Sequence, residues 1–161
     1  MRKIFLDRNG FTLIELLTVI AIIAILGAVV APNLFRAVDR SKVSAVLADS
    51  RAIKGAATAY YSDTGEWPPD KSDGSDPGFA ANPADKIAGW DGPYLESWPA
   101  KNPWNGKYCY RNGRSEVFGE KASYLQLDKV PADALEELIE TLGEKVVKKE
   151  TDYVYILISQ E

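Results

Sequence analysis

The sequence contains no histidine and only one cysteine among its 161 residues. Histidine is the commonest general base and a frequent transition-metal ligand, so its absence lowers the expectation of a hydrolase or a zinc enzyme. A single cysteine cannot form an intramolecular disulfide, so the fold must be held together by packing. Cys109 stands between two tyrosines in a predicted strand, where a free buried thiol is expected. We therefore predict that the protein is not an enzyme.

Most of the chain also lacks an excess of positive charge. The formal net charge is −4, and residues 1–10 carry a side-chain charge of +2, which leaves −6 for residues 11–161. Nucleic-acid-binding proteins usually present a basic face, so no nucleic-acid partner is expected. The length allows one compact domain in addition to a membrane segment.

One long apolar run is present, FTLIELLTVIAIIAILGAVVA at residues 11–31, with Glu15 as its only charge. At ~1.5 Å per residue, this helix would span the ~30 Å hydrocarbon core of a bilayer. A secretory signal peptide has a similar plan, but cleavage after Ala31 would place Pro32 directly beyond the cut. We predict a membrane-spanning helix, with the basic N-terminus in the cytoplasm and the remaining chain on the other side of the inner membrane.

The helical pattern continues to about Tyr61, now with one apolar face. Its apolar positions are Val43, Val46, Leu47, Ile53, Ala57, Tyr60 and Tyr61. Residues 62–65 end the helix, and residues 66–104 form a region rich in proline and glycine. This loop carries all four tryptophans, so we expect it to be folded against the domain.

The C-terminal third predicts strands and one short helix. Asn112 and Gly113 are a frequent hairpin turn, here between predicted strands at residues 107–111 and 115–118. Further strands are expected at residues 122–127 and 153–158, and a helix is expected between Pro131 and Gly143. The fold class is therefore α+β, with a long N-terminal helix packed on a small antiparallel sheet.

The N-terminal residues carry a specific combination of features. A short basic leader ends at Gly10, and Phe11 follows. Counted from Phe11 as the first residue, an acidic residue stands at the fifth position, Glu15, and a proline stands some twenty residues in, Pro32. This combination resembles the N-terminal signature of the type IV pilin superfamily. The resemblance implies that a prepilin peptidase cuts between Gly10 and Phe11 and methylates the new amine of Phe11. It also implies a leader at residues 1–10, a transmembrane and filament-core helix at residues 11–31, and a periplasmic pilin-like domain at residues 32–161.

Glu15 can also be considered from its physical setting. A carboxylate inside a membrane helix is costly and is normally paired or functional. The amine of Phe11 is the nearest cation after cleavage, and the resemblance implies a pairing of Glu15 with the amine of a neighbouring subunit during assembly. Pro32 corresponds to the proline that kinks the helix in this family, although a proline at the exit from the membrane is equally compatible.

A second resemblance concerns the loop and the strand that follows it. The residues concerned are Tyr61, Asp63, Gly65, Trp67, Pro68, Gly92, Pro93, Tyr94, Leu95, Pro99, Asn102, Pro103, Trp104, Asn105, Gly106, Tyr108 and Tyr110. They resemble the major pseudopilin of type II secretion systems, although Asn102 stands where an aspartate is more usual.

The resemblance implies a pseudopilus subunit that polymerises to drive protein export. Its partners would be copies of itself, prepilin peptidase, an inner-membrane assembly platform and minor pilins. Two alternatives remain open. One is a type IV pilus subunit for adhesion, motility or DNA uptake, and the other is a membrane-tethered binding module whose aromatic loop captures a ligand.

No cofactor is expected, and calcium is the one metal for which the sequence offers candidate ligands. Asp70, Asp73 and Asp76 are spaced by three residues and offer oxygen ligands, but the twelve-residue pattern of a known calcium loop is missing. These carboxylates are better explained as solvated turn residues.

Overall fold

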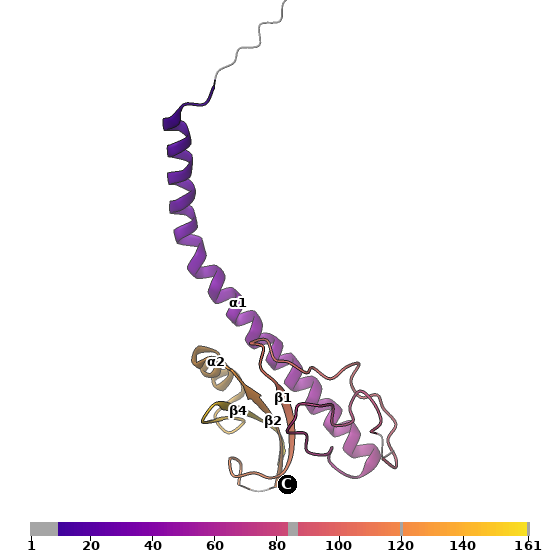
Figure 1. The fold of residues 1–161 in the computed structure, drawn as a ribbon. Coiled ribbons are helices and arrows are strands. Elements are labelled where there is room, and N and C mark those ends of the chain that lie inside the picture. Colours follow the sequence, from indigo (N-terminus) through magenta and orange to yellow (C-terminus); the bar gives the residue numbers. More distant parts are fainter. Residues whose placement is uncertain (1–9, 84–86, 120, 161) are drawn as a thin grey trace, which may run out of the picture. The chain divides into compact units, whose positions relative to one another are not determined.

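The computed structural model describes residues 10–83, 87–119 and 121–160. The elements follow the order α1, β1, β2, α2, β3 and β4, and α1 is a single helix of 52 residues, Leu13–Thr64 (Figure 1). This helix continues through Pro32 and Gly55 without interruption. The molecule divides into two compact units between Val38 and Asp39, so α1 belongs to both.

Within the second unit, α1 supplies one side of the hydrophobic core. Its buried residues are Val43, Val46, Ser50, Ile53, Ala56, Ala57 and Tyr60, which recur at three- and four-residue steps as one helical face requires. The predicted apolar face is therefore confirmed, except that Tyr61 remains 42% exposed. The Tyr108 hydroxyl donates a hydrogen bond of 2.8 Å to Asp49 Oδ2 and so joins the helix to the sheet.

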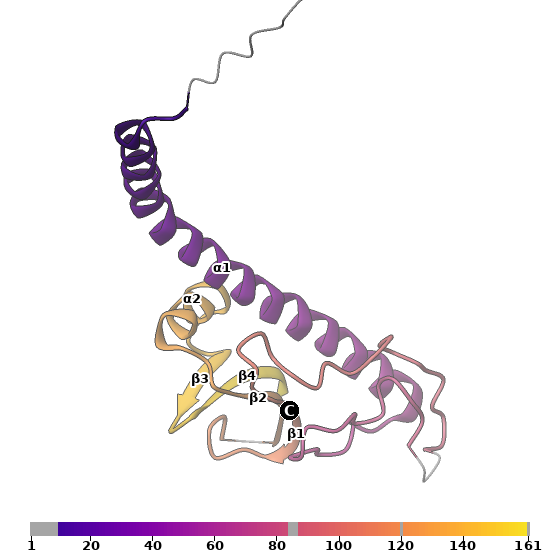
Figure 2. The same ribbon diagram turned by 45° about the horizontal axis from the view of Figure 1, so that its top comes forward.

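The sheet has four antiparallel strands in the order β1-β2-β4-β3, with α1 crossing one face (Figures 1 and 2). The strands are β1 Tyr108–Arg114, β2 Lys121–Asp128, β3 Val147–Glu150 and β4 Tyr153–Gln160. Burial alternates along β2 and β4, as expected when one face is covered. The predicted strands at residues 122–127 and 153–158 are confirmed.

The predicted hairpin turn at Asn112 and Gly113 is wrong. Strand β1 runs through both residues, which pair with Ser123 and Ala122 of β2. Residues 115–118, predicted as a strand, belong to the connection instead, where the Ser115 hydroxyl accepts a hydrogen bond from the Phe118 amide. Gly113 does have a positive φ of 139°, but cross-strand pairing holds this position within the ladder.

Helix α2, Ala132–Leu142, follows Pro131 and ends at Gly143, as predicted. Gly143 has a φ of 90° and donates its amide hydrogen to the Ile139 carbonyl, which explains why a residue without a side chain stands there. Leu138 is fully buried in the core. Strand β3 was not predicted, because its sequence VKKE contains one buried residue, Val147, and otherwise reads as a charged turn.

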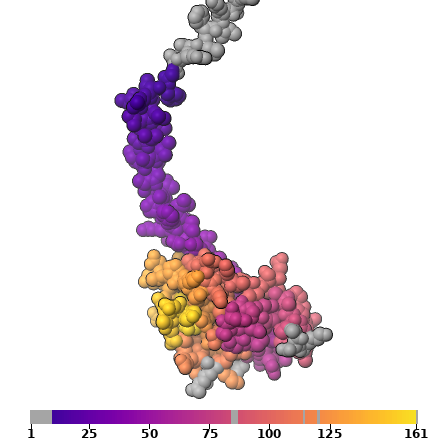
Figure 3. Space-filling view, viewed as in Figure 1, coloured from indigo at the N-terminus to yellow at the C-terminus, as the bar shows by residue number. Residues whose placement is uncertain are grey.

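The loop between α1 and β1 is folded onto the domain, as expected. Phe79 is completely buried and meets the ring of Tyr110 at 5.4 Å between centroids. The indole nitrogens of Trp90 and Trp98 donate to the carbonyls of Gly78 and Gly74, at 2.7 and 2.9 Å. Figure 3 shows this loop, in magenta to rose, closely packed beside the orange strands.

Asn102 closes the loop against the end of β2. Its side-chain amide donates to the Asp128 carbonyl at 2.7 Å, and its Oδ1 accepts from the amides of Trp104 and Gly106, each at 3.0 Å. The chain is so close here that a Cβ at Gly106 would collide with Asp128 and the Asn102 amide. Asn102 is 4% exposed, and its hydrogen bond from the Gly106 amide is buried, whereas the other two are partly buried.

Candidate functional site

The predicted cleavage position lies just before the first turn of α1. Phe11 is 88% exposed, and a Cβ placed on Gly10 would meet no atom within 4 Å. Since the helix begins at Leu13, the peptide bond between Gly10 and Phe11 lies in exposed, non-helical chain. The rest of the predicted leader, residues 1–9, lies outside the described residues.

Glu15 is held by Thr12 in a reciprocal cap. Glu15 Oε2 accepts from the Thr12 amide at 2.8 Å and from the Thr12 hydroxyl at 2.7 Å, while the Glu15 amide donates to the same hydroxyl at 3.2 Å. This is a capping box, in which a threonine before the helix and a glutamate three residues later satisfy each other's amides. Sequence reasoning missed it, although Thr-x-x-Glu before an apolar run is its recognised signal.

The cap changes what Glu15 requires. The sequence suggested that this carboxylate needs a cation, whereas in the structure two hydrogen bonds from Thr12 already satisfy one of its oxygens. A negative charge in the first turn also interacts favourably with the N-terminal end of the helix dipole. Glu15 can therefore be accommodated locally in a single chain before any second subunit is present.

The helix beyond Glu15 presents an extensive apolar surface. Every large apolar side chain between Phe11 and Val38 has an exposed fraction between 45% and 88%. Among the described residues, α1 is the one helix long and apolar enough to cross a membrane, through its N-terminal part. Pro32 lies in this exposed stretch and within the helix. Such a surface is far larger than soluble monomers usually leave uncovered.

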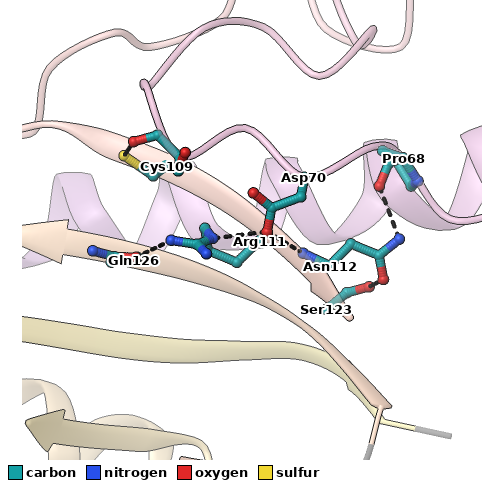
Figure 4. Close-up of polar contacts among 8 residues, drawn as sticks. Pro68, Asp70, Cys109, Arg111, Asn112, Ser123 and Gln126 are labelled. Carbon is teal, nitrogen blue, oxygen red and sulfur yellow. Dashed lines mark hydrogen bonds and ion pairs between the residues drawn. The ribbon is translucent and has the colours of Figure 1, made fainter. Parts of the chain in front are cut away.

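The three candidate calcium carboxylates are each bound to protein donors. Asp70 Oδ2 accepts from Arg111 Nε at 2.8 Å and from the Asn112 amide at 3.3 Å (Figure 4). Asp73 Oδ1 accepts from the amide and hydroxyl of Ser75, and these bonds lower the pKa of Asp73.

Asp76 is more fully occupied than the other two. Its Oδ1 accepts from the amides of Gly78 and Phe79, and its Oδ2 accepts from those of Ala80 and Ala81, at 2.8 to 3.2 Å. No group of three potential metal ligands from His, Cys, Asp and Glu occurs among the described residues. The expectation that no cofactor binds, with calcium as the weak alternative, stays a prediction.

Cys109 is a free, buried cysteine, as predicted. Its Sγ donates to the Ser72 carbonyl at 3.3 Å, which places it between β1 and the loop (Figure 4). Burial raises the pKa of the thiol, so the reactive thiolate is disfavoured at neutral pH. This environment is typical of a structural cysteine.

Two family descriptions match the chain. "Prokaryotic N-terminal methylation motif" matches residues 6–31, and "PilW, C-terminal" matches residues 37–123, which is more than half of the chain. The first covers the predicted cleavage position and Glu15. The second covers α1 from residue 37 onward, the loop, β1 and the first three residues of β2.

Curated relatives include pilus and secretion proteins. The chain is 36% identical to a fimbrial protein of Neisseria meningitidis over 117 residues, which are 72% of this chain and 64% of that protein. It is 37% identical to the type IV major pilin protein PilE1 of Neisseria gonorrhoeae, over 72% of this chain and 67% of that protein. Identity to the type II secretion system core protein G of Pseudomonas aeruginosa is 33%, over 65% of this chain and 73% of that protein.

Coverage of the fimbrial relatives is incomplete. The chain spans about two fifths of a fimbrial protein from Eikenella corrodens and just under two thirds of those from Neisseria meningitidis. The methylation motif matches the N-terminal residues, and the pilin relatives are 36–37% identical over 72% of the chain. The chain belongs to the type IV pilin-like superfamily.

Proposed function

We propose that this protein is the structural subunit of a filament, held in the inner membrane by residues 11–31 before assembly. The observation that carries the proposal is the exposed apolar surface of the N-terminal part of α1. Glu15 is the one carboxylate between Phe11 and Pro32, and it accepts a hydrogen bond from the Thr12 amide of the same chain. Lipid would cover this surface first, and identical helices would replace the lipid in the filament. The basic residues of the leader favour a cytoplasmic N-terminus and a periplasmic domain.

Processing by prepilin peptidase between Gly10 and Phe11, followed by methylation of Phe11, is part of this proposal. Exposure of both residues and the late start of α1 support it, because a protease binds its substrate in an extended form. Mass spectrometry of the protein from its native host should find a chain that begins with methylated Phe11. An intact leader would contradict the proposal.

A pair of valine substitutions tests the requirement at Gly10. Gly10→Val should block cleavage, because a branched side chain obstructs close approach of the backbone to the enzyme. Gly27→Val is the matched control, since a Cβ at Gly27 also meets no atom within 4 Å, and it should be processed normally. Equal cleavage of the Gly10→Val and Gly27→Val variants would contradict the proposed requirement for glycine at position 10.

Glu15 is proposed to exchange its Thr12 partner for the Phe11 amine of a neighbouring subunit during assembly. An ion pair with the charged amine would be stronger than the hydrogen bonds from the uncharged donors of Thr12, because water is excluded between packed helices. Each incoming subunit would thereby be set in register with the previous one.

Glu15→Gln separates the charge from the cap, because glutamine can also serve in a capping box. We expect this variant to be inserted and cleaved but to form no filaments. Thr18→Val is a suitable control, since the Thr18 hydroxyl donates to the Ile14 carbonyl within the same helix. Normal assembly of Glu15→Gln would show that the negative charge of Glu15 is unnecessary for assembly and would contradict the proposed ion pair.

We further propose that the filament is a pseudopilus that drives protein export in a type II secretion system. The relative named core protein G supports this, as it is matched over 73% of its length. A type IV pilus is the second candidate, favoured by the fimbrial names of the Neisseria relatives. In both cases the proposed partners are copies of the chain, minor pilins and an inner-membrane assembly platform.

Deletion of the gene in the native host distinguishes the two candidates. Loss of proteins from the culture medium, with surface fibres and twitching intact, would support the pseudopilus. Loss of fibres with normal secretion would contradict it and would support the pilus.

A further inference from the structure

A groove lies where the end of α1 meets the ends of β1, β2 and β4. Its volume is about 360 Å³, within the ~300–1,000 Å³ typical of small-molecule sites. All of its lining residues belong to the unit that begins at Asp39. No step of the proposed assembly uses this groove.

Two stacked aromatic rings form one wall of the groove. The centroids of Tyr61 and Trp67 are 4.7 Å apart, with 27° between the ring planes. Tyr61 was expected in the core but is 42% exposed, so the pair is anchored on the domain while part of it faces solvent. The negative face of an aromatic ring attracts the slightly positive C–H groups on the flat side of a sugar ring.

A row of neutral polar residues forms another part of the lining. Asn112, Ser123 and Ser159 are direct register partners across β1, β2 and β4. The Ser123 hydroxyl donates to Asn112 Oδ1 at 3.2 Å, and Asn112 Nδ2 donates to the Pro68 carbonyl at 3.0 Å (Figure 4). These bonds fix the Asn112 amide and use one of its two N–H groups. The other N–H and the Ser159 hydroxyl remain suited to ligand hydroxyls.

Two irregularities occur beside this polar row. The register between β2 and β4 shifts between Ser123 and Tyr124, and such bulges often re-aim side chains near binding sites. The buried Tyr110 hydroxyl makes no hydrogen bond within the described part of the chain. Tyr110 precedes Asn112 by two residues in β1, so the two side chains lie on the same face of the sheet. The face of the sheet that carries the polar row therefore also carries one hydroxyl, that of Tyr110, without a hydrogen bond among the described residues.

Charge and strand pairing narrow the class of ligand. Glu66 and Lys121 both line the groove and carry opposite charges, which favours a neutral ligand over an anion or a cation. An extended peptide would need a free strand edge, but the loop already occupies the outer edge of β1. There the Lys71 amide donates to the Tyr110 carbonyl and the Asn112 amide donates to Asp70.

We propose that this groove binds a neutral carbohydrate. One sugar ring lies against the aromatic pair of Tyr61 and Trp67, and its hydroxyl groups bond to Asn112 and Ser159. If the chain polymerises as proposed above, each subunit carries one such groove, and weak single-site binding is multiplied along the filament. The binding itself does not depend on polymerisation.

The test titrates the full chain, held in a detergent without a sugar head group, with N-acetyl-D-glucosamine, its β-1,4-linked trimer and maltotriose. Tryptophan fluorescence and calorimetry should show saturable binding of at least one of them in the millimolar range or below. Tyr61→Ala and Ser159→Ala should each weaken it, Tyr61→Ala by about tenfold or more, whereas Tyr61→Phe should retain it. Tyr153→Ala is the matched control, because Tyr153 is 40% exposed and lies outside the groove, and it should bind normally.

Several outcomes would overturn the proposal. One is the absence of saturable binding for all three sugars, and another is unchanged affinity in Tyr61→Ala with its circular dichroism intact. Loss of binding in Tyr153→Ala but not in Tyr61→Ala would place the site elsewhere. Saturable binding of tetra-alanine, with no sugar bound, would assign the groove to peptides.

Discussion

Asn102 offers a sharp test of the physical account of the loop. Its buried side chain makes three hydrogen bonds, two within residues 102–106 and one to the end of β2. Each of these hydrogen bonds should contribute about 1 kcal/mol to the free energy of unfolding. Asn102→Ala removes the side-chain partner of two backbone amides and one backbone carbonyl. Asn102→Ala should therefore lower the free energy of unfolding by about 3 kcal/mol. At ~4 °C per kcal/mol for a domain of this size, the Tm should fall by roughly 12 °C.

Asn102→Asp tests the hydrogen bond that the Asn102 amide donates to the Asp128 carbonyl. The aspartate can still accept from Trp104 and Gly106, but when ionised it presents an oxygen to the Asp128 carbonyl, where the native amide donates. Protonation restores a donor at that position. The loss of stability relative to wild type should therefore be larger at about pH 7 than at about pH 4.

Thermal unfolding of the full chain in detergent, followed by circular dichroism, gives both measurements. Asn82→Ala is the control in the same loop, because Asn82 is exposed and accepts a hydrogen bond from the Ile87 amide. This substitution should lower the free energy of unfolding by less than about 1 kcal/mol. Equal stability of Asn102→Ala and Asn82→Ala would contradict a stabilising role for the three Asn102 hydrogen bonds. A larger loss of stability for Asn102→Asp at the lower pH would argue against the hydrogen bond donated by the Asn102 amide.

Three further predictions concern the packing of the loop. Phe79→Ala should cost about 3–5 kcal/mol in chemical denaturation, since Phe79 is wholly buried; a loss below 1 kcal/mol would contradict its place in the core. Asp70→Asn should lower the free energy of unfolding by no more than about 1 kcal/mol, because the Asp70–Arg111 ion pair is partly exposed. High salt should reduce the difference in stability between this variant and the wild type. Cys109 should resist a thiol reagent at about pH 8 until the protein is unfolded, because burial raises its pKa; rapid labelling of the native protein would be the contrary result.

The sequence predicted the long helix and the last strand well, because their apolar residues follow one period over many positions. It misplaced the hairpin because Asn112 and Gly113 have the composition of a turn. In the structure, the backbone and side chain of Asn112 are instead engaged by the loop and by Ser123. Such distant partners leave no local signal.

The candidate site shows the same contrast. Gly10, Phe11 and Glu15 could be selected from a short stretch because their spacing is itself the signal. The capping bond of Thr12 was also readable locally, yet the rarity of a membrane carboxylate drew attention to cations instead. The groove beside Tyr61 could not be foreseen, because residues from one helix, one loop and three strands line it.

The Asp76 carboxylate has a consequence for the order of folding. Its four bonds reach amides two to five residues further along the chain, so no long loop has to close before they form. The bond between Tyr108 and Asp49, by contrast, joins residues 59 positions apart. We therefore expect the turn around Asp76 to form early and to present Phe79 while the sheet is still incomplete. An irregular, proline-rich segment would then act as an early template for the core that it later helps to cover.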